Sequence, residues 1–287
     1  MNRTVLRYSF LTNAPLLAGA AVVIGSMVLS LAWLFPLLSA DATYTEMLET
    51  IPEQLRQALG VSGDQTEYFG FLTANYYNSL HLYFMMALVL LLGHRLVSKP
   101  IDDTSLNYFL NGSLPRASYL IARLVFFLLA SVGIAVVSLV SMVVGQLVFD
   151  WGSPVEWRGM VVLNVNLLVL FLFLGSVVFL IRMLTKTGVE ALAGSTGLVI
   201  FQYFLSMVEP LSPHLSWLRY LTVFSLFDVD RHVGNTGVFL AVVVGLTAAS
   251  VVVSAISVHL FRRKDLFPLT PCPCLRARVR GPGRSAR

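Results

Sequence analysis

Residues 159–184 read GMVVLNVNLLVLFLFLGSVVFLIRML, a continuous apolar stretch whose single charged residue, Arg182, lies near its end. An α-helix crosses the roughly 30 Å hydrocarbon core of a bilayer in about 20 residues. The stretch exceeds that length and contains no proline or charge in its interior. It therefore predicts a membrane-spanning helix.

The rest of the chain follows the same pattern. Of its 287 residues, 56% are hydrophobic and only 12% are charged, whereas a soluble domain has about 25% charged residues. Further apolar runs of spanning length occupy residues 15–38, 77–98, 118–149, 189–208 and 237–260. We therefore predict an all-α integral membrane protein with six transmembrane helices. The run at 189–208 is rich in small and polar residues, so we expect it to face other helices.

The N-terminal residues are predicted to remain part of the protein. Arg3 and Arg7 precede the first apolar run, which is too long for the apolar region of a signal peptide and ends near Pro36. Residues 2–12 combine these arginines with apolar side chains at helical spacing. We expect them to form an interfacial amphipathic helix before the first span.

Lysine and arginine are distributed unevenly between the two sides of the predicted spans. Sixteen of the 20 lie in residues 1–10, 95–123, 182–190 and 261–287, and four lie in the alternate segments. The positive-inside rule therefore predicts that both termini are cytoplasmic, in a multi-pass protein of the cell membrane. The basic pI of about 9.4 then reflects membrane topology, and we expect no nucleic-acid partner.

The predicted outer side contains two segments with short helices. The stretch TYTEMLETIPEQLRQALG, residues 43–60, has apolar residues at helical spacing. The stretch SWLRYLTVFSLF, residues 216–227, is too short to cross the bilayer and too apolar for free solvent, so we expect re-entrant helices there. An aromatic belt is expected at the start of the second span. It comprises Tyr68, Phe69, Phe71, Tyr76, Tyr77 and Tyr83.

Catalytic and metal-binding patterns are few. Nothing matches the phosphate-binding loop G-x-x-x-x-G-K-[ST], so the chain is not expected to hydrolyse ATP by itself. The string GVSG, residues 60–63, occurs in some intramembrane serine proteases, but Ser62 is in a predicted acidic loop and a turn is favoured. Cys272 and Cys274 have no nearby histidine to complete a metal site. We predict no cofactor and no metal bound by this chain, and we predict that it is not an enzyme.

Polar residues inside the spans are mostly uncharged. Asn164, Asn166 and Gln202 are expected to hold helices together by hydrogen bonds. The near absence of intramembrane charge argues against an ion-coupled carrier.

A patterned polar segment, DDTSLNYFLNGSLPRASY at residues 102–119, connects the second and third spans. Asp102 and Asp103 are suited to cap a helix start, and Leu106, Phe109 and Leu110 share one helical face. A helix of about two turns is marginal alone. It needs a partner surface: the inner ends of the spans, the lipid headgroups or another protein.

This segment resembles the corresponding part of type-2 ABC exporter permeases. In RLVSKPIDDTSLNYFLNGSLPRASYLIARL, residues 95–124, Ser105 and Leu106 match a Thr-Leu pair and Phe109 and Leu110 match paired leucines. Arg116 matches the family's arginine. Two positions depart, because Asn107 replaces a glutamate and Ser113 a proline.

Other stretches of the chain resemble the same family. They are IPEQLRQALG followed by EYFGFL, LSWLRYLTVFSLFD before the last span, and SAISVHLFRRKDL at the end of it. The resemblance covers residues 1–266.

The resemblance implies a permease subunit that pairs with a second permease subunit and binds a P-loop ATPase, which holds the ATP and magnesium. The segment between the second and third spans would be a coupling helix. Its implied coupling residues are Asp102, Asp103, Ser105, Leu106, Asn107, Phe109, Leu110 and Arg116. Residues 267–287 form a predicted disordered basic tail beside membrane lipids. The alternatives are an intramembrane hydrolase using Ser62 and a scaffold without transport.

Overall fold

A computed structural model of the chain describes residues 3–39, 50–52, 55, 68–103, 115–149, 157–227 and 235–263. These residues form helices and turns with no strand, and they include six helices long and apolar enough to cross a membrane. The protein is therefore an all-α integral membrane protein, as predicted. Four spans are single helices, α1 (Arg3–Ser39), α8 (Arg116–Phe149), α9 (Trp157–Leu184) and α12 (Thr236–Arg263).

The second and fifth spans are composite. The second runs through α4 (Tyr68–Leu72), the π-helical η1 (Thr73–His81), α5 (Leu82–Gly93), the π-helical η2 (His94–Ser98) and α6 (Lys99–Asp102). The fifth is α10 (Gly188–Val208), which continues into the 3₁₀ turn η3 (Glu209–Leu211).

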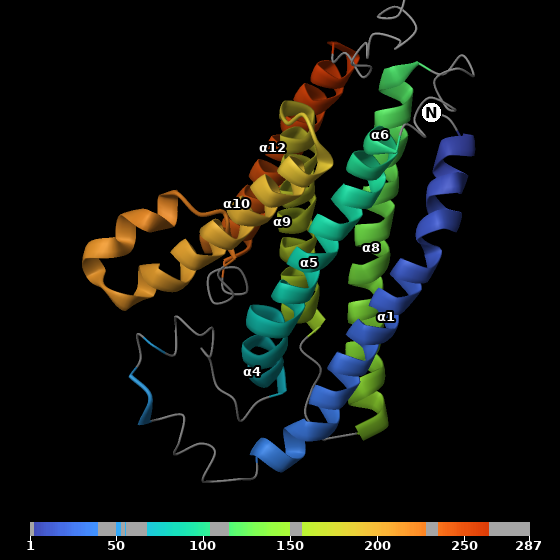
Figure 1. Cartoon of the computed structure of the whole chain (residues 1–287). Coiled ribbons are helices and arrows are strands. Elements are labelled where there is room, and N and C mark those ends of the chain that lie inside the picture. The colour runs from blue at the N-terminus through green and yellow to red at the C-terminus, as the bar shows by residue number, and fades with distance from the viewer. Residues whose placement is uncertain are drawn as a thin grey trace, which may run out of the picture.

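The fourth span, α9, is the central helix of the bundle. It packs against α5, α8, α10 and α12, and it is the most buried span, whereas α12 is the most exposed. α1 lies along α8 on the other side (Figure 1). Close packing with α8 is allowed by Gly175, where a Cβ atom would overlap the ring of Phe127. Small residues bring helices together in this way because lipid supplies no hydrophobic force between them.

The first turns of α1 correct one prediction. No separate interfacial helix precedes the first span, because the helix is continuous from Arg3 and its 37 residues extend about 55 Å. Val5 and Ser9 are buried, and the ring of Phe10 packs edge-on against Phe126 of α8 at 4.8 Å. Contact with α8 therefore favours continuing the helix over laying these residues on the membrane surface.

The aromatic residues at the start of the second span are also placed differently from the prediction. Tyr68, Phe71, Tyr76 and Tyr77 are buried within the bundle instead of lying at a lipid interface. The hydroxyl groups of Tyr76 and Tyr77 find partners there, since Tyr76 Oη lies 2.9 Å from Ser138 Oγ and Tyr77 Oη accepts from Asn164 Nδ2. This pairing makes burial between helices favourable.

The uncharged polar residues join helices, as expected. The amide Nδ2 of Asn164 donates to the hydroxyl of Tyr77 and to the carbonyl of Met160. Asn166 Nδ2 donates to the carbonyl of Leu226 over 3.5 Å.

Short 3₁₀ helices connect the fifth and sixth spans where a short helical segment is expected. η3 continues α10 outward, and the chain then folds back through η4 (Pro213–Tyr220) and η5 (Phe224–Leu226) (Figure 1). Gln202 holds the returning arm, because its Oε1 accepts from the backbone N–H of Val223 over 3.0 Å and its carbonyl accepts from Thr222 Oγ1 over 2.8 Å. The fold-back is thus stabilised by protein groups. Most of residues 43–60 lie outside the described residues.

Candidate functional site

The candidate site lies where the second span ends. Asp102 is the last residue of α6, and the N–H of Asp103 closes that helix by donating to the carbonyl of Lys99 over 2.9 Å. The prediction that Asp102 caps the start of a new helix is therefore wrong. α6 continues η2 without a break in the helical backbone, and the helix runs through Pro100 to Asp102.

An ion pair joins this helix end to the fourth span. Arg182 of α9 donates from Nη2 to Oδ1 of Asp102 over 2.8 Å. Its side chain is 2% exposed, whereas that of Asp102 is 36% exposed. A charged residue near the end of a span can extend into water, but Arg182 stays within the bundle.

The pairing compensates two unfavourable features at once. A carboxylate at a helix C-terminus faces the negative end of the helix dipole, and a buried guanidinium loses hydration. Arg182 also donates from Nη1 to the carbonyls of Thr185 and Lys186, at 3.2 and 3.4 Å. One arginine therefore ties α6, α9 and the connection to α10 together.

The fifth span begins at this same junction with a capping box. Thr187 is the N-cap residue, and its Oγ1 accepts from the N–H of Glu190 over 3.2 Å, while Glu190 Oε2 accepts from the N–H of Thr187 over 3.4 Å. Gly188 follows directly, and a Cβ atom there would overlap the carboxylate of Asp102. The close approach of α10 to Asp102 therefore requires glycine.

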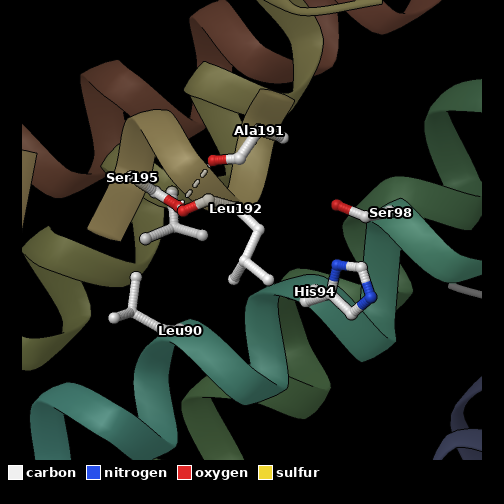
Figure 2. Close-up of a pocket in the computed structure, with 7 residues that line it drawn as sticks. Leu90, His94, Ser98, Ala191, Leu192 and Ser195 are labelled. Carbon is white, nitrogen blue, oxygen red and sulfur yellow. Dashed lines mark hydrogen bonds between the residues drawn. The ribbon is translucent and has the colours of Figure 1, made fainter. Parts of the chain in front are cut away.

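A small pocket lies beside the junction, between the second and fifth spans. It has essentially no space for a water molecule, whereas a typical small-molecule site holds about 300 Å³ or more. Figure 2 shows His94 and Ser98 of η2 on one wall and Ser195 of α10 on the other. The Ser195 hydroxyl is engaged with the Ala191 carbonyl over 2.7 Å. This pocket is therefore a packing gap between two spans.

The predicted coupling residues fall partly within the described structure. Asp102 and Asp103 end the second span, and Arg116 begins α8 at the same end of the bundle (Figure 1). The other predicted coupling residues lie outside the described residues. They are Ser105, Leu106, Asn107, Phe109 and Leu110. Ser62, Cys272 and Cys274 also lie outside them.

Sequence reasoning missed the partner of Asp102 and the start of α10. The pattern Thr-x-x-Glu at 187–190 is a readable capping-box signal before an apolar run. The Asp102–Arg182 pair has no such signal, because the residues are 80 positions apart. Within the described ranges, no group of three or more His, Cys, Asp or Glu side chains is arranged to hold a metal ion.

Comparison of the chain with protein-family models, with curated proteins and with solved structures gave no match. The likeness to type-2 ABC exporter permeases therefore rests on the sequence motifs alone.

Proposed function

We propose that this protein is the permease subunit of an ATP-driven ABC transporter, most simply an exporter. The observation that carries the proposal is the anchoring of the segment between the second and third spans. That segment follows Asp102, which is bonded to Arg182, and precedes Arg116, the first residue of α8. A segment joined at both ends to bundle helices is suited to pass on a force applied to it.

The junction supplies a route for that force. A displacement of residues 104–114 pulls on Asp102, and the ion pair transmits it to Arg182 in α9. Gly188 is packed against the same carboxylate, so α10 moves with it.

The energy source in this proposal is a separate P-loop ATPase that binds ATP and magnesium. A second permease subunit, of the same or another kind, completes the translocation pathway. Residues 1–266 form the transmembrane domain, and residues 267–287 form the basic tail on the cytoplasmic side. The protein acts in the cell membrane with both termini inside.

The test is a double substitution, Phe109→Asp with Leu110→Asp. Charges on the apolar face of the segment should remove it from an ATPase groove, since burying unpaired carboxylates is costly. We expect the tagged wild-type protein, purified from its native membrane, to carry a nucleotide-hydrolysing subunit, and the double variant to lose it. The control exchanges the two residues, Phe109→Leu with Leu110→Phe, which keeps the face apolar.

Two outcomes contradict the proposal. Purified wild-type protein without any ATP-hydrolysing partner removes its energy source. Equal partner retention and transport in the aspartate variant removes the coupling role of the segment. Loss of activity on substitution of Ser62 would instead favour the hydrolase.

A further inference from the structure

A second buried arginine, Arg123, lies near the start of α8. It is 2% exposed, like Arg182, but it pairs with no carboxylate among the residues that the structure describes. A buried guanidinium without a counter-charge is unfavourable. Arg182 shows how this protein satisfies such a group when a carboxylate is present.

The protein partners of Arg123 are all neutral. Its Nη1 donates to Ser9 Oγ over 2.8 Å, and its Nη2 donates to Tyr119 Oη over 3.0 Å. The rings of Tyr8 and Tyr119 flank it, with their centroids 5.8 and 5.0 Å from Cζ. The guanidinium therefore lies close to two aromatic rings, which attract cations.

One edge of the guanidinium is left over. The Nε atom of Arg123 is buried and has no hydrogen-bond partner in the described structure. Guanidinium groups bind carboxylate and phosphate through N–H groups that lie in the guanidinium plane, often two at a time. The Nε–H is thus the guanidinium donor that the described residues leave for an anion.

The helices around Arg123 provide no anion of their own. Over their described lengths, α1, α8 and α12 contain no aspartate or glutamate. They do contain further arginines. Arg7 precedes Tyr8 in α1, and Arg262 and Arg263 follow Phe261, whose ring stacks on Tyr119 at 6.4 Å. The junction of these three helices is therefore a basic corner without a counter-charge.

The corner lies at the depth of lipid headgroups. Arg123 is seven residues from the start of a 34-residue helix, and a helix of that length extends beyond the hydrocarbon core. Tyr8, whose ring centroid lies 5.8 Å from the guanidinium carbon of Arg123, is 47% exposed and borders the membrane-facing surface. Basic pockets between spans at this depth suit anionic headgroups.

We propose that the junction of α1, α8 and α12 binds the phosphate group of an anionic phospholipid through Arg123. The phosphate supplies the counter-charge that these helices lack and accepts from Nε. Tyr8 is the side chain that moves to admit it. This inference is independent of the proposed transport function, because it rests only on the described helices.

The test measures lipid retention by native mass spectrometry on the full chain in detergent, with phosphatidylglycerol and phosphatidylcholine as probes. We expect the wild type to retain phosphatidylglycerol in preference to phosphatidylcholine. Arg123→Gln should weaken this retention by about tenfold, the size expected for a lost charge-assisted hydrogen bond. Arg123→Lys should retain part of it. Arg95→Gln, which removes an exposed arginine of the second span outside this corner, is the matched control and should change it little.

A second measurement uses only the wild type, in case Arg123→Gln fails to fold. Phosphatidylglycerol carrying a photoreactive group near its phosphate should label the first turns of α1 and α8, and the equivalent phosphatidylcholine should not.

Three results overturn the proposal. They are equal retention of the two lipids, equal retention by Arg123→Gln and the wild type, and labelling without preference for the anionic lipid. Inorganic phosphate alone, if it displaces the lipid at low concentration, overturns the lipid as the ligand and assigns the site to free phosphate.

Discussion

The Nη2 atom of Arg182 lies 2.8 Å from the Oδ1 atom of Asp102, so that two residues 80 positions apart in sequence hold the second and fourth spans together. The bond lies at the end of the second span. It fixes this end to the fourth span.

The first prediction concerns this ion pair. Asp102→Asn should lower the free energy of unfolding by about 1–3 kcal/mol, because it leaves the buried Arg182 without its counter-charge. Denaturant unfolding in mild detergent measures the change. Asp103→Asn, which removes the exposed neighbouring carboxylate, should have little effect. Equal losses in the two variants would show that the pair contributes nothing specific.

A double-mutant cycle separates the pair from its surroundings. In the Asp102→Asn background, Arg182→Met should lower the free energy of unfolding by less than it does in the wild type. The reason is that the charge it removes is already unpaired. The coupling energy should be about 1–3 kcal/mol. Additive effects of the two substitutions would argue against a direct interaction.

The second prediction concerns Gly188. Gly188→Ala should destabilise the protein by about 1–3 kcal/mol, because its Cβ overlaps the Asp102 carboxylate and pushes it away from Arg182. Gly197→Ala in the same helix has open space around its Cβ and should be neutral or stabilising. Thermal unfolding of both variants tests this. Since Gly188→Ala acts through Asp102, its effect should shrink in Asp102→Asn, and an undiminished effect would contradict the mechanism.

The third prediction concerns the polar contact inside the bundle. Tyr77→Phe should lower the free energy of unfolding by about 0.6–1.7 kcal/mol, because Asn164 loses its hydroxyl partner within the membrane span. Tyr220→Phe is the control, since Tyr220 is 90% exposed. Stability in denaturant distinguishes them, and a larger loss in Tyr220→Phe would refute the role assigned to Tyr77.

The fourth prediction concerns the fold-back between the fifth and sixth spans. Gln202→Ala should speed amide hydrogen exchange at Val223 and the following residues, because their bond to Gln202 Oε1 is lost. Exchange in α9 should stay unchanged. Ser206→Ala is the control, since that hydroxyl bonds only within its own helix, to the Tyr203 carbonyl. Unchanged exchange in Gln202→Ala would show that other contacts hold the arm.

Hydropathy predicted the six spans because each needs about 20 apolar residues, and α9 (Trp157–Leu184) begins two residues before the predicted span and ends with it. It placed the start of the second span nine residues late, at 77 instead of Tyr68. Residues 68–76 contain Thr73 and Asn75 among aromatic rings. Their hydroxyl and amide groups bond to carbonyls one turn back, which allows a polar sequence to enter the bundle.

The candidate site was predictable only in part. The predicted second span ends at residue 98, and Asp102 and Asp103 are predicted to cap a new helix, whereas the second span continues to Asp102. The sequence does not reveal that Arg182 forms an ion pair with Asp102, because that contact depends on how α6 packs against α9. The same holds for the Arg123 corner, where Ser9 and Tyr119 come together from two helices.

The π-helical segment η2 sets the orientation of Asp102 about the axis of the second span. In η2 the N–H of Lys99 donates to the carbonyl of His94, five residues back, so this turn holds one residue more than an α-helical turn. Deleting one residue from 94–98 would rotate everything beyond it by about 100° about the helix axis. Asp102 would then turn away from Arg182 and Gly188. The direction in which Asp102 points is therefore set by the number of residues in η2. Neither hydropathy nor charge reveals that number.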